Sequence, residues 1–157
     1  MLTPPPKRLS EICTKGGGYV FGAKDLFGDP AGLVRASQTS GSPGIVYVAM
    51  NYRLGAFCFL GGPSLQANAG LHDQRLALEW VQQHIAQFGG DPSRVTILGE
   101  SAGGGSIFHQ ITAFGGLLPV AFQQAVSQSE AWFPRPGNEQ QEEVFNDFLN
   151  STECQYA

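Results

Sequence analysis

The sequence predicts an α/β fold in which a mostly parallel sheet is flanked by helices. Apolar runs of strand length alternate along the chain with longer stretches whose apolar residues recur at helical spacing, and this order is typical of right-handed crossovers between parallel strands. One apolar run also enters a Gly-x-Ser-x-Gly segment directly, and small residues at that spacing allow a strand to turn sharply into a helix.

The first clear strand and the first long helix follow each other in the chain. Residues 45–50 form a continuous apolar run, which predicts a parallel strand covered on both faces. Residues 71–88 then read as a helix, because Leu78, Val81 and Ile85 recur at helical spacing and a glycine pair ends the pattern. The chain before these elements is different. Residues 1–15, with a triple proline and few strand-forming residues, are expected to be an irregular N-terminal arm.

The second half of the chain predicts a strand, a helix, a further strand and a final helix. The β-branched run 95–98 is the strand, and residues 102–113 can continue as a helix beyond their glycines. Residues 125–128 form a plausible next strand. Asn138 can cap the final helix with Gln141 three residues on, and the apolar residues that follow would form one face of that helix.

The segment Gly99-Glu100-Ser101-Ala102-Gly103 has the spacing of a nucleophile elbow. A strand that turns abruptly into a helix strains its corner residue, and small neighbours let the two backbones pack closely. Ser101 would then stand exposed above the sheet as a candidate nucleophile. A glycine-rich turn with a surface serine is the alternative interpretation of the pentapeptide alone.

Several longer motifs in the right order accompany this pentapeptide. They are 51–60 (Asn-Tyr-Arg-Leu-Gly-Ala-Phe-Cys-Phe-Leu), 68–81, which contains Asp-Gln-Arg-Leu-Ala-Leu, 88–95 (Phe-Gly-Gly-Asp-Pro-Ser-Arg-Val), and 16–22 (Gly-Gly-Gly-Tyr-Val-Phe-Gly). From about Gly16 to Ser129 the chain resembles the type B carboxylesterases, which are the carboxylesterase, cholinesterase and fungal lipase branch of the α/β-hydrolases. The resemblance implies a partial α/β-hydrolase domain over residues 16–157. It also implies that the chain is a truncated piece from the N-terminal half of a longer catalytic domain.

The resemblance also assigns the site. It implies that Ser101 is the nucleophile, that the backbone N–H groups of Gly17, Gly18 and Ala102 form the oxyanion hole, and that Glu100 is a secondary site residue near the catalytic histidine. It further implies that the triad acid and histidine map beyond the last residue. His109 lies eight residues after Ser101 on the predicted helix, about 12 Å along its axis at 1.5 Å per residue, so it is not a credible base.

Three further residues bear on whether the site is complete. Lys15 stands where the family has histidine or tyrosine before the glycines, so we expect a poorly anchored oxyanion loop. Cys58 stands where the family has glycine, and its side chain is expected to crowd a close backbone contact. The family also pairs the arginine of Asn-Tyr-Arg with the aspartate of Asp-Gln-Arg, which here would join Arg53 to Asp73 as a structural brace.

The predicted function is therefore that of a serine carboxylic ester hydrolase acting on a small-molecule ester or lipid, with weak or no activity in these residues alone. The alternative is a non-catalytic fragment that binds a hydrophobic ligand, or a partner that covers the missing half of the fold. Charged residues are 14% and the formal charge is −4 without basic clusters, so nothing suggests nucleic-acid binding. No cofactor, metal-ligand spacing or membrane span is indicated. The start lacks the apolar segment of a signal peptide, and the compartment stays open, although many family members are secreted.

Overall fold

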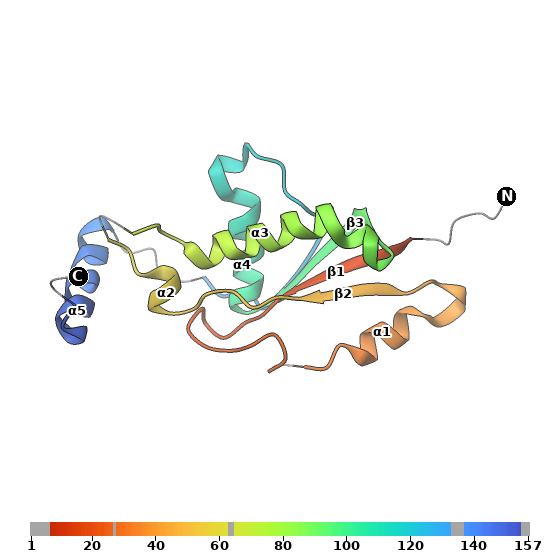
Figure 1. Ribbon diagram of the computed structural model, residues 1–157, viewed down its shortest axis with the longest axis horizontal. Coiled ribbons are helices and arrows are strands. Elements are labelled where there is room, and N and C mark those ends of the chain that lie inside the picture. Colours follow the sequence, from red (N-terminus) through yellow and green to blue (C-terminus); the bar gives the residue numbers. More distant parts are fainter. Residues whose placement is uncertain (1–6, 27, 63–64, 133–136, 155–157) are drawn as a thin grey trace.

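The computed structural model describes residues 7–26, 28–62, 65–132 and 137–154 (Figure 1). Its centre is a parallel sheet of four strands in the order β2-β1-β3-β4. The strands are β1 (Arg8–Thr14), β2 (Ile45–Ala49), β3 (Gly90–Glu100) and β4 (Gln124–Gln128). This confirms the α/β class with a parallel sheet.

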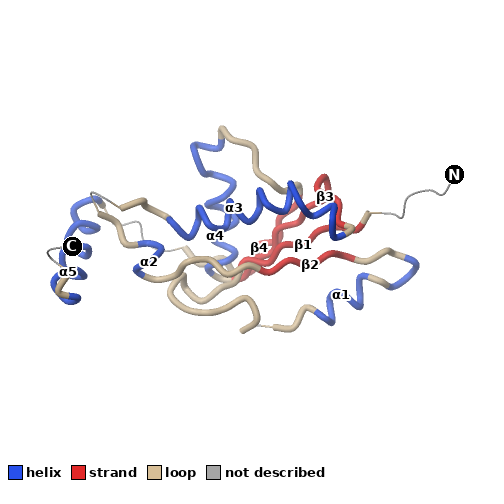
Figure 2. The backbone as a smooth tube through the Cα atoms, viewed as in Figure 1, coloured by secondary structure: helices blue, strands red, loops and turns tan. Residues whose placement is uncertain are grey.

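Helices cover the sheet and continue beyond it (Figure 2). In Figure 1, α3 runs along the strands on one side, α1 lies beside β2 on the other side, and α5 lies beyond α2, far from the N-terminus. The α-helices are α1 (Ala31–Ser37), α2 (Ala56–Phe59), α3 (Ala69–His84), α4 (Ala102–Thr112) and α5 (Asn138–Thr152). Short 3-10 turns are η1 (Thr39–Gly41), η2 (Ile85–Phe88) and η3 (Ala113–Gly116).

The N-terminal arm predicted from the sequence is largely a strand. Residues 8–14 are not irregular: they form β1, which is paired with β2 on one side and β3 on the other. Ser10, Ile12 and Thr14 alternate on the buried face, each at most 1% exposed. Strand formation here depends on neighbours, since β-propensity mostly measures how a side chain fits between adjacent strands. Residues 1–6 of the predicted arm lie outside the described residues.

The other predicted elements are present with small differences. The helix expected over 71–88 is α3 followed by the tighter turn η2, and it ends at Gly89, whose φ is 80°. The strand expected to be covered on both faces, β2, is mostly half-buried. The final helix begins as expected, but Gly137 rather than Asn138 is its cap, and the Gly137 N–H donates to Oε1 of Gln140 at 3.1 Å. No described side chain of α5 is buried.

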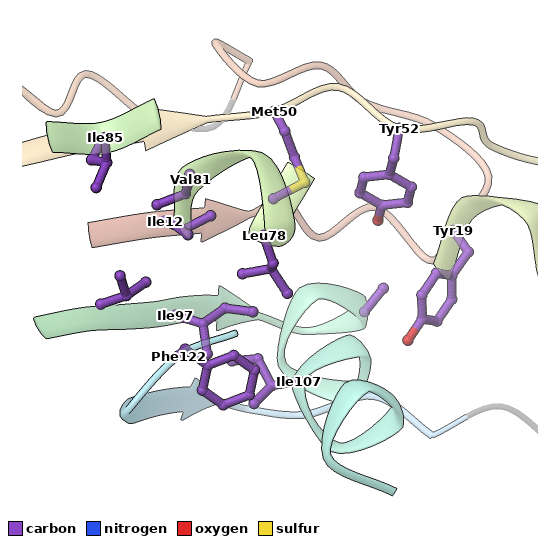
Figure 3. Close-up of a cluster of buried hydrophobic side chains, with 12 residues drawn as sticks. Ile12, Tyr19, Met50, Tyr52, Leu78, Val81, Ile85, Ile97, Ile107 and Phe122 are labelled. Atoms are coloured by element: carbon purple, nitrogen blue, oxygen red, sulfur yellow. The ribbon is translucent and has the colours of Figure 1, made fainter. Parts of the chain in front are cut away.

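The hydrophobic core lies between β1, β3 and the helices α3 and α4 (Figure 3). Its central side chains are almost fully buried: Ile12, Leu78, Val81, Ile85, Val95, Ile97 and Ile107 are each at most 2% exposed. Figure 3 also shows Tyr19 and Tyr52 on the side toward which the strands point. The core therefore holds the carboxyl ends of β1 and β3 side by side, and the candidate site is built at those ends.

Candidate active site

Ser101 occupies the sharp corner between β3 and α4. Its backbone has φ 55° and ψ −120°, in the left-handed half of conformational space that non-glycine residues rarely adopt. Three hydrogen bonds hold it there: the Ser101 N–H donates to the Gln128 carbonyl at 2.9 Å, and the Ser101 carbonyl accepts from Gly105 and Ala131 at 3.0 Å. The strain expected for an elbow serine is present, and the turn is tied to the end of β4 as well as to its own helix.

The two glycines of the pentapeptide allow the helix to pack closely on the sheet. A Cβ atom at Gly103 would collide with the carbonyl oxygen of Thr14, and one at Gly99 would collide with the backbone of Gly103. Thr14 closes the contact, because its buried hydroxyl lies 3.1 Å from the carbonyl oxygens of both Leu98 and Gly103. The prediction that these glycines permit close backbone packing is confirmed. The elbow is supported by β1, because Thr14, its last residue, contacts both the strand before Ser101 and the helix after it.

The residues that follow β1 pass beside the serine, and we call residues 16–22 the glycine loop. A Cβ atom on Gly16 would lie 3.3 Å from the Ser101 Cβ and 2.8 Å from Oε2 of Glu100. Any larger residue at this position would therefore press on the corner. Glu100, the exposed residue before the serine, directs its carboxylate toward the start of the glycine loop.

Two consecutive glycines of the loop have positive φ angles, which favour glycine. Gly17 and Gly18 have φ values of 97° and 60°, and a Cβ on Gly17 would collide with the Phe21 carbonyl. Within the described residues, the N–H groups of Gly17 and Gly18 donate no backbone hydrogen bond. Ala102 is the first residue of α4, where a helix leaves its N–H groups without internal partners. Three backbone donors thus lie in segments that meet at Ser101.

A chain of buried polar side chains that was not predicted from the sequence lies behind the glycine loop. Gln74 on α3 donates through Nε2 to the Ser106 hydroxyl at 3.1 Å, and Ser106 on α4 contacts the Tyr19 hydroxyl at 3.4 Å. Burial raises the pKa of Tyr19 above its ordinary value, which further favours the protonated hydroxyl. The only available signal was Gln74, a polar residue on the apolar face of its helix. Its partners come from separate segments that no spacing rule connects.

Lys15 also departs from expectation. It is 7% exposed, and its ammonium donates to the Gly22 carbonyl at 2.6 Å and lies 5.1 Å from the centre of the Tyr52 ring. The Tyr52 hydroxyl in turn donates to the Lys15 carbonyl at 3.1 Å. The expectation of a poorly anchored loop is therefore wrong: Lys15 extends β1 into the glycine loop and is held by two defined partners.

None of the histidines is brought to the serine by the fold. His72 and His84 lie on α3, and His84 is near Gln87. His109 lies on α4, where its ring packs edge-on against Trp132 with centroids 5.6 Å apart. Since α4 is unbroken from Ala102, the predicted separation of about 12 Å along the axis from the serine holds.

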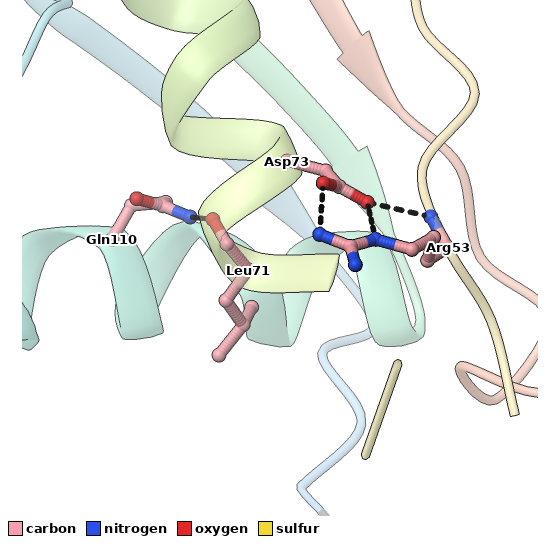
Figure 4. A network of polar contacts seen from close by, with 4 residues as sticks. All are labelled: Arg53, Leu71, Asp73 and Gln110. Carbon is pink, nitrogen blue, oxygen red and sulfur yellow. Dashed lines mark hydrogen bonds and ion pairs between the residues drawn. The ribbon is translucent and has the colours of Figure 1, made fainter. Parts of the chain in front are cut away.

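The brace predicted between Arg53 and Asp73 is present (Figure 4). Two guanidinium nitrogens of Arg53 donate to the two carboxylate oxygens at 2.8 and 2.9 Å, and the Arg53 N–H adds a third bond at 3.0 Å. The side-chain bond from Arg53 lowers the pKa of Asp73 below its ordinary value of 3.8. A second link in Figure 4 joins α4 to α3, where Gln110 donates to the Leu71 carbonyl at 2.7 Å. These contacts hold the segment after β2 and the two long helices together.

Cys58 is accommodated rather than crowded. Its side chain is 2% exposed and fills the space left by Gly70 on α3, since a Cβ atom on Gly70 would collide with the Cys58 sulfur. Burial raises the pKa of the Cys58 thiol to about 11. The expected crowding is therefore relieved by a glycine on the facing helix.

Among the described residues, no cluster of three or more histidine, cysteine, aspartate or glutamate side chains could hold a metal ion. No helix of the described part of the chain has both the length and the apolar character needed to cross a bilayer.

Known protein structures share the fold of this chain. The Aspergillus niger EstA crystal structure superimposes with a TM-score of 0.87 at 36% identity, over 98% of this chain and 29% of that one. A thermophilic PNB esterase matches with a TM-score of 0.76 and 33% identity, over 96% of this chain and 30% of that one. The fold is therefore that of the α/β-hydrolase esterases.

The sequence comparisons narrow this class to a family. The model of the carboxylesterase family matches residues 12–157, so the chain belongs to that family. It is 54% identical over 123 residues to carboxylesterase patB of Penicillium expansum, covering 75% of this chain and 22% of that protein. It is also 50% identical over 117 residues to lipase 1 of Geotrichum candidum, covering 72% and 20% of the two chains. The chain thus spans about a fifth of the length of these two relatives.

Proposed function

We propose that the chain contributes the nucleophile and the oxyanion hole of a carboxylic ester hydrolase. The observation that carries this proposal is the strained backbone of Ser101 directly beside the glycine loop. Strain of this kind costs about 1–3 kcal/mol and persists where the surrounding structure enforces it, typically at reactive sites. A surface serine in an ordinary glycine-rich turn needs neither three backbone ties nor a loop packed against its Cβ.

In the proposed reaction the Ser101 hydroxyl oxygen attacks the ester carbonyl carbon while its proton passes to a base. The carbonyl oxygen becomes an oxyanion, which accepts hydrogen bonds from the N–H groups of Gly17, Gly18 and Ala102. Each such donor can stabilise the transition state by about 3 kcal/mol. The alcohol then leaves with a proton, and water releases the acid from the acyl-serine by the same steps in reverse. Glu100 would contribute negative charge beside the loop, where it can influence the charge of the base.

The base and its acidic partner are proposed to come from polypeptide outside these 157 residues. His109, the histidine nearest to Ser101 in sequence, is about 12 Å along an intact helix, whereas a base needs hydrogen-bond distance. Removing a triad member commonly lowers turnover by about 10⁴- to 10⁶-fold and leaves the contribution of the oxyanion hole. The 157 residues by themselves are therefore expected to hydrolyse esters weakly or not at all, while Ser101 keeps measurable reactivity. The proposed substrates are small-molecule esters or lipids.

The test measures phosphonylation of individual serines by a fluorophosphonate, followed by peptide mass spectrometry. Ser101 should react at least tenfold faster than Ser151, an exposed serine on α5, because only Ser101 lies beside oxyanion donors. Ser101→Ala should remove this label, and Ser151→Ala should not change it. Equal modification of both serines in a folded sample would show that Ser101 is not activated, and the proposal would be wrong.

A second candidate function is binding of a polypeptide partner without catalysis. It is favoured by the edge of the sheet, because β4 is the last strand in the order and Val126 on it is 42% exposed. Leu117 and Trp132, which lie before and after β4, are 86% and 54% exposed. Exposed apolar surfaces of this kind mark interaction sites. This function does not need an activated serine, so the same labelling experiment separates it from ester hydrolysis.

A further inference from the structure

We propose that Lys15 is a positioning residue for the glycine loop, holding the start and the end of that loop together so that its N–H groups stay directed at Ser101. The proposal rests on the proposed function, because it concerns the donors assigned to the oxyanion. It goes beyond that function by giving a defined task to a side chain that takes no part in the chemistry.

Lys15 stands between the end of β1 and the start of the glycine loop. It follows Thr14, the last residue of β1, and precedes Gly16, so the paired strand fixes the point at which the glycine loop begins. Its side chain reaches seven residues ahead, and the ammonium donates to the carbonyl of Gly22 at 2.6 Å. One side chain therefore joins the two ends of the glycine loop. A hydrogen bond from a charged donor is shorter and stronger than a neutral one, which suits this task.

Tyr52 contacts both the backbone and the side chain of Lys15. The Tyr52 hydroxyl, itself buried, donates to the Lys15 carbonyl at 3.1 Å, and the ring lies 5.1 Å from the ammonium. A cation within about 6 Å of an aromatic ring is attracted to its face. Tyr52 belongs to the segment after β2, which the Arg53–Asp73 brace fixes to α3. The loop is thus attached to the sheet through β1, and to α3 through Tyr52 and the brace that follows it.

The positive charge of the Lys15 side chain supports the same role. Within the described residues, no carboxylate forms an ion pair with Lys15, whose side chain is almost fully buried. Burying an ammonium without a counter-ion is unfavourable, and a neutral side chain would fill the same space at lower cost. The hydrogen bond from the ammonium to the Gly22 carbonyl offsets part of this cost, and only a charged or polar donor at this position can make it.

The hydrogen bonds within the glycine loop show what the bond from Lys15 to Gly22 would control. The N–H groups of Val20 and Phe21 donate to the Gly17 carbonyl at 3.1 and 3.2 Å, which closes a turn inside the loop. This turn fixes the peptide plane that carries the Gly18 N–H. If Gly22 is released, the turn loses its outer support, and displacements of about 1 Å are enough to reduce catalysis strongly.

The experiment compares Lys15→Met, which keeps the volume and removes the donor, with Lys15→Arg, which keeps a cationic donor. Lys24→Met is the matched control, because Lys24 is an exposed lysine two residues after the loop. Two readouts are taken on folded protein: hydrogen exchange of peptides covering residues 16–22, and the rate of Ser101 phosphonylation. Lys15→Met should increase loop exchange and decrease phosphonylation, each by about tenfold or more. Lys15→Arg should recover a large part of both, and Lys24→Met should change neither.

The outcomes separate the two proposals. Unchanged loop exchange in Lys15→Met, with Ser101 still labelled, would overturn the positioning role and leave the proposed function standing. Faster loop exchange in Lys15→Met, with Ser101 unreactive even in the unaltered chain, would support the positioning role and overturn the proposed function. If Lys15→Met does not fold, Tyr52→Phe decides the question, because it removes the hydroxyl that donates to the Lys15 carbonyl and keeps the ring beside the ammonium. Tyr52→Phe should then shift both readouts in the same direction by a smaller factor. No shift in either readout would refute the positioning role of Lys15.

Discussion

Replacing Gly103 by alanine tests whether α4 packs on the end of β1 as closely as the structure indicates. A Cβ at this position would collide with the Thr14 carbonyl oxygen and lie 2.8 Å from the Thr14 carbonyl carbon and 3.0 Å from the Lys15 carbonyl oxygen. All three atoms belong to backbone, so no side chain can rotate away. Inserting a methyl group into such a site typically costs about 1–3 kcal/mol, and rigid neighbours favour the upper end of that range.

Helix propensity opposes the steric cost of Gly103→Ala, and a second helical glycine offers a matched control. Alanine is favoured over glycine inside a helix by about 1 kcal/mol, so the net destabilisation expected for Gly103→Ala is about 2 kcal/mol. A Cβ atom on Gly32 of α1 would meet no other atom within 4 Å, so Gly32→Ala should stabilise the protein by up to about 1 kcal/mol. The same chemical change is thus expected to have opposite signs at two helical glycines.

Thermal unfolding followed by circular dichroism measures both variants. For a domain of about this size, 1 kcal/mol shifts the midpoint by about 2–4 °C, so Gly103→Ala should unfold about 4–8 °C lower and Gly32→Ala slightly higher. Phosphonylation of Ser101 should also slow in Gly103→Ala, because the corner must move with the helix. A midpoint for Gly103→Ala at or above that of the unaltered protein would refute the close contact between α4 and β1.

Three further outcomes are expected. Ser101→Gly should abolish phosphonylation yet raise the unfolding temperature, because glycine relieves backbone strain of about 1 kcal/mol or more, and a lower temperature would contradict the strained corner. Because the bond from Arg53 lowers the pKa of Asp73, the corresponding stability is present above the unfolded pKa near 3.8 and is lost as the pH falls through the folded value. The urea midpoint of Asp73→Asn should therefore change less between pH 7 and pH 3 than that of the unaltered protein, and an equal change would argue against the brace. The buried Cys58 thiol, with a pKa of about 11, should react with iodoacetamide only on unfolding, whereas the exposed Cys154 should react in the native state, and equal rates by mass spectrometry would contradict the packing.

Much of the fold was accessible to sequence reasoning because its signals are local. The run at 95–98 and the helix after Ser101 were predicted from propensity and from the Gly-x-Ser-x-Gly spacing, and both are present as β3 and α4. The helix α3 was recognised because its buried residues, among them Leu78 and Val81, repeat at helical spacing. The Arg53–Asp73 pair was predicted by resemblance, and the structure contains it.

The errors concern residues whose conformation depends on distant neighbours. Residues 8–14 carry Ser10 and Thr14 on the buried face, and nothing local marks them as a central strand. They adopt that role because β2 and β3 offer hydrogen-bonding partners on both sides, and pairing outweighs weak propensity. Lys15 and Cys58 were misjudged for the same reason, since their acceptor and their free space are supplied by Gly22 and Gly70.

The sequence by itself determined the class of fold, the family motifs and the identity of the candidate nucleophile, because strand and helix periodicity and glycine spacing are properties of neighbouring residues. Only the tertiary structure decided that β1 is central, that the glycine loop meets Ser101, and that Lys15 and Tyr52 hold that loop. These features join residues far apart in the chain through parallel pairing and burial. Such contacts form only when the whole sheet is assembled, so no single segment of the sequence encodes them.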